Sequence, residues 1–165
     1  MLVKKRKKNL FMIWQPMVLA LLWLAIIGST SAQELISPHP NIQPKNVIKI
    51  QLQSLQKNNV PRPDAGILQT WAFAHPSNRL MTGPFERFTL MMKSQNYRYI
   101  LNHRNHKIER VFKTNGRSQF AVTITTEDDK KMTFKWELEK VQKGVFSGSW
   151  MTTSVSPPLL LGDTS

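Results

Sequence analysis

The sequence predicts an α+β domain in which three N-terminal helices pack on a curved antiparallel sheet of about four strands, preceded by an N-terminal hydrophobic segment. Apolar residues recur with a helical period before Ser94 and with the strand period of two after it. The dipeptide Asn115-Gly116, between two alternating runs, is the strongest two-residue hairpin signal in the chain. With 165 residues, one domain is expected.

The first 33 residues have the composition of an export signal or a membrane anchor. Five cations at 4–8 precede an uncharged run from Asn9 to Gln33. Its part Met17–Ile27 has the length of a signal-peptide core, with Ala32 as the cleavage position. The longer stretch Leu10–Ile27, at eighteen residues, approaches the length of a membrane span. Both alternatives stay open, and both place the rest of the chain outside the cytoplasm, in a periplasm or lumen.

The charge and the lack of cysteine exclude several classes of protein. The net charge is +13, and beyond residue 33 there remain 18 Lys/Arg against 10 Asp/Glu. Outside the cytoplasm such a charge suits anionic lipid, acidic polymers or solubility, so no nucleic-acid partner is expected. The sequence has no cysteine, which excludes disulfides, thiol chemistry and a lipid attached to a cysteine.

Three short helices are expected before residue 94. A Pro-rich linker at 34–44 leads to the first helix, over Lys45–Asn58, which has an apolar stripe on one side. The second helix follows Asp64, its expected N-cap, and ends before His75-Pro76. Residues 76–78 are expected to form a turn, and the third helix starts at Gly83-Pro84.

Four strands are expected after the helices. The first two, Lys107–Thr114 and Arg117–Thr126, form the hairpin around Asn115-Gly116. In the third, Met132, Phe134, Trp136 and Leu138 alternate with polar residues, as in a half-buried strand. The last strand is expected over Val145–Thr153, which completes a domain at 45–153 and leaves a flexible tail at 154–165.

Several short motifs together resemble one family. They are Val47–Leu55, Pro63–Ile67, Phe73–Arg79, Thr82–Phe88 and Trp150–Thr152. In combination they are similar to the domain-of-unknown-function family 4864, over roughly Lys45 to Thr153. The resemblance implies a cone of the nuclear-transport-factor-2-like, or cystatin-like, superfamily, with a pocket between the helices and the concave face of the sheet. It implies no activity, because none is established for the family.

The sequence offers little for catalysis. An isomerase or dehydratase in such a cone needs a carboxylate or imidazole inside an apolar pocket. The apolar face of the third strand supplies neither, which counts against an enzyme. Asp64 and His75 are weak catalytic candidates, and their simplest roles are a helix N-cap and local hydrogen bonding at a helix end.

Six basic residues and one acid lie between Arg98 and Arg117. The candidates for an anion-binding patch within this segment are Arg98, His103, Arg104, His106, Lys107 and Arg110. The alternative is a set of solvated strand-edge charges that discourage edge-to-edge pairing. The neighbouring cations oppose a metal ion at the histidines, so neither a metal nor a cofactor is expected.

Five aromatic residues are candidates for the wall of a ligand pocket: Trp71, Phe73, Phe88, Trp136 and Trp150. A domain this small also needs such rings for its core, and the two roles overlap in a cone. We therefore expect a non-catalytic exported or anchored module that binds a small apolar or amphipathic ligand, or a protein partner. The alternatives are a scaffold whose basic patch rests on anionic lipid, and an isomerase- or dehydratase-type enzyme.

Overall fold

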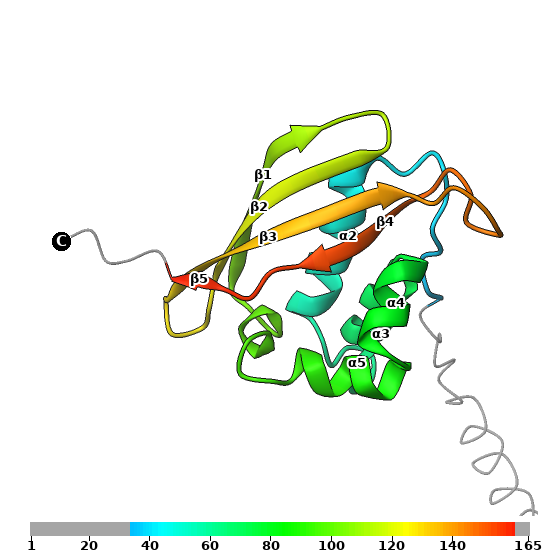
Figure 1. Cartoon of the computed structure of the whole chain (residues 1–165). Helices are drawn as coiled ribbons and strands as arrows, with labels where there is room; N and C mark the ends of the chain where they lie inside the picture. The colour runs from blue at the N-terminus through cyan, green and yellow to red at the C-terminus, as the bar shows by residue number, and fades with distance from the viewer. Residues whose placement is uncertain (1–33, 161–165) are drawn as a thin grey trace, which may run out of the picture. The chain divides into compact units, whose positions relative to one another are not determined.

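A computed structural model describes residues 34–160 (Figure 1). The helical part consists of α2 (Pro44–Gln56), α3 (Ala65–Ala72), α4 (Pro76–Thr82), α5 (Phe85–Met92) and a 3₁₀ turn η1 (Arg98–Ile100). The sheet consists of β1 (Asn105–Lys113), β2 (Arg117–Thr125), β3 (Lys131–Lys140), β4 (Trp150–Val155) and β5 (Leu159–Leu160). Its pairs are antiparallel in the order β1-β2-β3-β4, and β5 pairs with β3.

The predicted α+β class and the antiparallel sheet are confirmed, but residues 34–160 contain four α-helices rather than three. Residues 76–78, predicted as a turn, instead begin α4. The sequence of α4 has no apolar stripe by which a helix could be recognised, and accordingly none of its residues is fully buried. The predicted N-terminal hydrophobic segment lies outside the described residues, and within 34–160 no helix has the length and apolar character to cross a bilayer.

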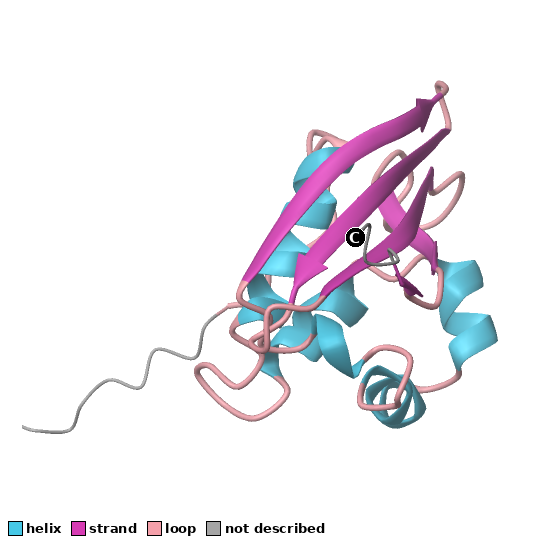
Figure 2. Ribbon diagram, turned by 90° about the vertical axis from the view of Figure 1, so that its left-hand side faces the viewer, coloured by secondary structure: helices cyan, strands magenta, loops and turns pink. Residues whose placement is uncertain are grey.

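One hydrophobic core lies between α2 and the sheet (Figures 1 and 2). Val47, Ile48, Leu52 and Leu55 make up the buried stripe of α2, as their spacing predicts. Strands β2 and β3 are neighbours in the sheet, and both bury alternate residues in the core. Phe120 is paired with Trp136, and Val122 is paired with Phe134. Trp71 packs against the same core, so rings from both halves of the chain share one interior.

The segment after α3 extends the sheet beyond β4. Ala74 forms a parallel bridge with Thr152: the Thr152 amide donates to the Phe73 carbonyl at 2.8 Å, and the His75 amide donates to the Thr152 carbonyl at 2.9 Å. The prediction that the last strand starts at Val145 is wrong, because turns occupy the residues before Trp150. Gly144 and Gly148 have φ angles of +88° and +80°, which interrupt an extended chain.

Both ends of the described chain are fixed to the domain. The linker is held by Ile36, whose amide and carbonyl exchange two 2.8 Å hydrogen bonds with the side chain of Gln69 in α3. In the tail, Ser156 bonds Lys135, and β5 pairs with Met132 and Thr133 of β3. The tail was expected to be loosely held; up to Leu160, it is paired with the sheet instead.

Candidate functional site

A cavity of about 200 Å³ lies where α4 and α5 meet β4. Six residues define its chemistry: Met81 of α4, Met91 and Met92 of α5, Tyr97, Trp136 of β3 and Thr152 of β4. Most of the wall is apolar, and none of the lining residues carries a charge. The cavity therefore suits a ligand that is largely apolar and uncharged.

Tyr97 is the one titratable residue in the lining. Its hydroxyl donates to the Val155 carbonyl at 3.0 Å, and burial raises the pKa of this phenol above its usual value. A phenol that is protonated at neutral pH and already bonded to the backbone is a poor general base. The lining contains no carboxylate or imidazole that could take this part.

A buried polar cluster lies at the cavity wall, where α2 meets the sheet. The side-chain oxygen of Gln51 accepts from Thr152 Oγ1 at 2.8 Å and from Trp136 Nε1 at 3.2 Å. Its nitrogen donates to the Thr70 carbonyl at 3.2 Å. An amide nitrogen carries two hydrogens, and no second acceptor for Gln51 exists among the described residues.

The motifs used for the sequence resemblance meet around this cluster. The backbone of Thr152 forms hydrogen bonds with the backbone of Phe73 and His75, and its hydroxyl donates to the side chain of Gln51. Asn78 Nδ2 donates to the Thr152 carbonyl at 3.1 Å, so α4 is fixed to the same residue. Segments separated by some seventy to a hundred residues in the chain therefore meet at one strand residue.

A family model described as "Domain of unknown function (DUF4864)" matches residues 38–156. The chain belongs to this family. No curated protein and no solved structure matches the chain. The description assigns no ligand, reaction or location, so the chemistry of the DUF4864 domain has to be derived from its own residues.

The five predicted pocket aromatics have different environments. Trp136 and Phe88 line the cavity. Trp71 lies behind Phe88, with ring centroids 4.9 Å apart. Phe73 is fully buried in the core outside the lining, and Trp150 is buried with Lys140 Nζ 5.4 Å from its ring centroid. Two of the five candidates thus form cavity wall, while the other three support or extend the core.

Asp64 does not cap a helix with its side chain. It stands at the N-cap position of α3, but its φ of 61° is left-handed and its carboxylate accepts no bond from the first turn. The carboxylate instead accepts from Asn58 at 3.2 Å and pairs at 2.6 Å with Lys93, the C-cap residue of α5. Asp64 is absent from the cavity lining, so its geometry fits a tie between α5 and the end of α2.

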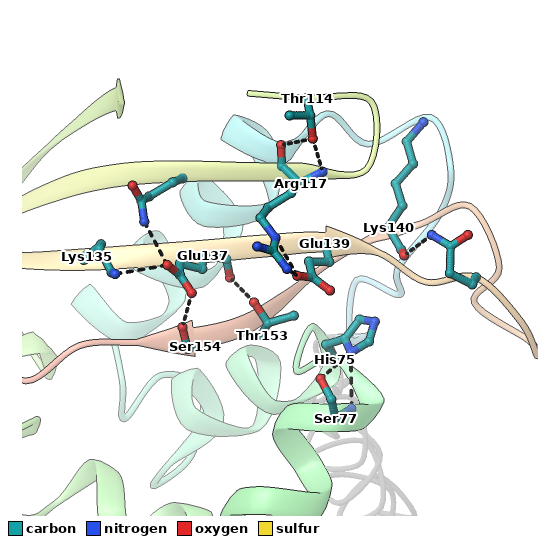
Figure 3. A network of polar contacts seen from close by, with 12 residues as sticks. His75, Ser77, Thr114, Arg117, Lys135, Glu137, Glu139, Lys140, Thr153 and Ser154 are labelled. Carbon is teal, nitrogen blue, oxygen red and sulfur yellow. Dashed lines mark hydrogen bonds and ion pairs between the residues drawn. The ribbon is translucent and has the colours of Figure 1, made fainter. Parts of the chain in front are cut away.

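His75 is the N-cap of α4 (Figure 3). Its Nδ1 accepts from the Ser77 amide at 3.2 Å and lies 2.7 Å from the Ser77 hydroxyl. Since Nδ1 accepts from an amide, the neutral ring carries its proton on Nε2. Burial lowers the pKa of His75, with Glu139 acting in the opposite direction. His75, like Asp64, lies outside the cavity lining.

The residues of the predicted anion patch do not form one surface. Strand β1 alternates its faces, so Lys107, opposite Thr123, and Arg110, opposite Phe120, point to different sides of the sheet. Two of the cations have acidic partners: Arg104 pairs with Asp129, and Lys107 pairs with Glu109 at 2.9 Å. Arg98 is stacked on Tyr99.

The two histidines of that patch bond each other. His103 is 2% exposed, and its Nδ1–H donates to the Ile100 carbonyl at 2.7 Å. Its Nε2 must then accept from Nδ1–H of His106, also at 2.7 Å. Burial lowers the pKa of His103 to about 4, although the Ile100 carbonyl opposes the shift. Burial and the nearby Lys49 lower the pKa of His106 as well. The pair is therefore neutral at pH 7, and it adds no charge to an anion site.

The sequence alone does not predict that Gln51, Met81, Met91 and Tyr97 are cavity residues. Of these four residues, only Gln51 could have been recognised from the sequence. It lies one turn from Ile48 and from Leu55, on the apolar side of α2. A polar residue inside an apolar stripe marks a buried hydrogen-bond partner. The other three become cavity residues only through the positions of α4, α5 and β4.

Proposed function

We propose that the DUF4864 domain is a non-catalytic module that binds a small, uncharged and largely apolar ligand in the cavity between α4, α5 and β4. The observation that carries this proposal is the lining, which contains methionines, aromatic rings and uncharged polar groups but no charged residue. A charged ligand would lose its hydration there without gaining a counter-ion. The uncharged polar residues of the lining, such as Gln51 and Thr152, would favour a ligand with one hydroxyl or carbonyl oxygen.

A role as an isomerase or dehydratase has little support from this chemistry. Asp64 and His75, the two candidate acid–base residues, bind Lys93 and Ser77 away from the cavity. The basic segment of β1 has little support as an anion site, because its charges are paired or divided between two faces.

The proposal also places the domain outside the cytoplasm, exported or anchored. Support comes from the composition of the N-terminus, where five cations precede a long uncharged and mostly apolar run. We further propose that the α+β fold is a member of the nuclear-transport-factor-2-like superfamily, on the order of its helices and strands.

Two alkyl compounds of equal chain length test the ligand class. The full chain is titrated with 1-decanol and, in parallel, with decanoate at pH 7.5, and its thermal unfolding is followed. A ligand that binds the folded state alone raises the melting temperature with concentration. We expect 1-decanol to raise it and decanoate to raise it far less. An equal or larger effect of decanoate, or no effect of either compound, would overturn the proposal.

A matched pair of variants tests whether the binding occurs in the cavity. Val155 lies in β4 and lines the cavity, whereas Val111 lies in β1 and is exposed. Val155→Phe adds a ring next to the cavity and should abolish the response to 1-decanol, while Val111→Phe should retain it. If Val155→Phe responds to 1-decanol like the unmodified chain, the alcohol binds elsewhere and the assigned site is wrong.

A further inference from the structure

We propose that Leu80 and Met81 of α4, together with Leu90 of α5, form a membrane-contact edge that rests on a lipid bilayer. Met81 also lines the cavity, so its ligand would enter from the bilayer; this last step rests on the proposed function.

Three strongly exposed apolar side chains lie on these two consecutive helices. Leu80 and Met81 are 87% and 82% exposed, and Leu90 is 72% exposed. Single exposed apolar residues are normal on protein surfaces. Two consecutive ones at the end of a helix, with a third on the next helix, resemble the side chains that interfacial helices insert between lipids.

Polar groups hold α4 in place, so its apolar residues are free to face outward. The His75 ring caps its start, and Asn78 donates to the Thr152 carbonyl. Arg79 donates to three backbone carbonyls at the end of α3, those of Trp71, Ala72 and Ala74. A helix on a water-facing surface usually buries its apolar side and exposes its polar side. In α4, Leu80 and Met81 are exposed, while Asn78 and Arg79 are half-buried.

The exposed edge is continuous with the cavity. Met81 belongs both to the exposed edge and to the cavity lining, and Met91, which follows Leu90, lines the same cavity. An uncharged apolar ligand is far more concentrated in a bilayer than in water. A mouth that faces lipid would therefore give such a ligand a path without transfer through water.

The linker is short enough to bring this edge to a membrane. Ile36 is bonded to Gln69 in the second half of α3, and the carbonyls at the end of α3 bind Arg79 of α4. The apolar run of the sequence ends at Ile27, nine residues before Ile36. Nine residues span at most about 30 Å. If the run lies in the bilayer, Ile36, which bonds Gln69 of α3, can lie no farther than that distance from it.

The charges near the edge favour apolar contact over electrostatic attraction. Arg87 packs against Gly83, at the junction of α4 and α5, and Glu86 is its neighbour in sequence. Contact through leucine and methionine depends little on salt, whereas attraction between cations and anionic lipid weakens as salt is added. The salt dependence of binding thus separates this edge from the basic segment of β1 as the membrane contact.

Because the chain has no cysteine, single cysteines give clean probe positions. Each variant of the full chain carries one cysteine, at position 80, 81 or 90, and this cysteine is coupled to a nitrobenzoxadiazole dye. The labelled chain is reconstituted into phosphatidylcholine vesicles. Matched controls carry the dye at Val145, which is 97% exposed, or at Val111 on β1, the opposite edge of the sheet from β4. Lipids with a nitroxide near the head group quench only dyes that contact the bilayer.

We expect quenching at positions 80, 81 and 90 that persists in high salt, and none at 111 or 145. Quenching at 111 in place of 80, or equal quenching at all five positions, would overturn the proposal. The absence of quenching at all five would overturn it too.

A double variant separates this proposal from the cavity proposal. Leu80→Glu with Leu90→Glu leaves the residues of the cavity lining intact. With the dye at position 81, the double variant should lose quenching. Without the dye, it should retain the melting response to 1-decanol. Retained quenching in the double variant contradicts the membrane edge. If 1-decanol does not raise the melting temperature of the unmodified chain, that result contradicts the cavity proposal but not the membrane edge.

Discussion

The guanidinium of Arg79 lies over the ring of Trp71, with Cζ 5.0 Å from the ring centroid. The same group donates to the Trp71 carbonyl at 2.9 Å, and further bonds reach the carbonyls of Ala72 and Ala74. The last carbonyls of a helix have no partner within it, so Arg79 satisfies the end of α3 from a position in α4. Stacking and planar hydrogen bonding together require arginine rather than lysine at this position.

Arg79→Lys should destabilise the domain by about 2 kcal/mol, since a lysine keeps the charge but cannot stack and reach three carbonyls at once. Urea denaturation followed by tryptophan fluorescence measures this free energy. Arg110→Lys is the control, because Arg110 is an exposed residue of β1, and its effect should stay within about 0.5 kcal/mol. Equal stability of the two variants would show that the guanidinium of Arg79 has no structural role.

Gly66 is the point of closest approach between α2 and α3. A Cβ atom there would lie 2.2 Å from the Ser54 carbonyl oxygen and 2.9 Å from the Asn58 Cα. Gly66→Ala should therefore push the helices apart and cost about 3 kcal/mol of unfolding free energy. Gly116→Ala is the matched control, because a Cβ at Gly116 meets nothing within 4 Å. Differential scanning calorimetry should place only the Gly66 variant well below the parent melting temperature.

Gln51, Thr152 and Trp136 should be energetically coupled. Thr152→Val leaves Trp136 Nε1 bonded to Gln51 and should cost about 1 kcal/mol. Gln51→Leu removes the acceptor of the Thr152 hydroxyl and one of the two donors to the Thr70 carbonyl, and it should cost about 2–3 kcal/mol. Because the two residues bond each other, the double variant should cost less than the sum of the single variants. Strict additivity in a double-mutant cycle would mean that the cluster does not act as a unit.

The stability of the domain should fall as the pH drops below the usual histidine pKa. His103 has a pKa lowered from 6.5 to about 4, so between these values the unfolded state takes up a proton that the folded state does not. The contribution of His103 to stability is therefore complete above pH 6.5, declines as the pH falls towards 4, and is then constant. His75 and His106 have lowered pKa values and add to the decline with the same sign.

His103→Asn should make the stability less dependent on pH between 6.5 and 4, as measured by urea denaturation at several pH values. In the parent chain, the imidazole signals of His103 in an NMR titration should keep their neutral positions until the pH approaches 4. A midpoint near 6.5 would mean that the ring is not buried and bonded as described.

Much of the fold could be predicted from local pattern. The strict alternation in β2 and β3 predicts the buried face. Successive side chains of a strand point to opposite faces of the sheet, and only one face is covered. Asn115-Gly116 predicts the β1–β2 hairpin, since this dipeptide between two alternating runs is typical of a two-residue hairpin loop. Helix α2 follows from its apolar stripe. These elements carry their signal within a few neighbouring residues.

The errors occurred where specific polar contacts, rather than an apolar stripe, hold an element in place. Helix α4 is held by the cap from His75, by the bond from its own Asn78 to β4 and by the bonds from its own Arg79 to the end of α3, and none of these produces an apolar period. The N-cap predicted for Asp64 failed because the backbone there turns left-handed and Lys93 takes the carboxylate. The tail was expected to be loosely held. Its pairing with Met132 could not be predicted, because it depends on which part of β3 has an open edge.

The sequence by itself determined the α+β class, the hairpin, the buried faces of α2, β2 and β3, and the family to which the chain belongs. Tertiary structure alone decided the position of the cavity and the neighbouring apolar edge on α4. The physical reason is that periodicity records whether a side chain faces the core, while a cavity exists where the side chains of separate elements fail to fill the space between them. Met81, Met91 and Thr152 acquire their shared role only after the chain has brought α4, α5 and β4 together.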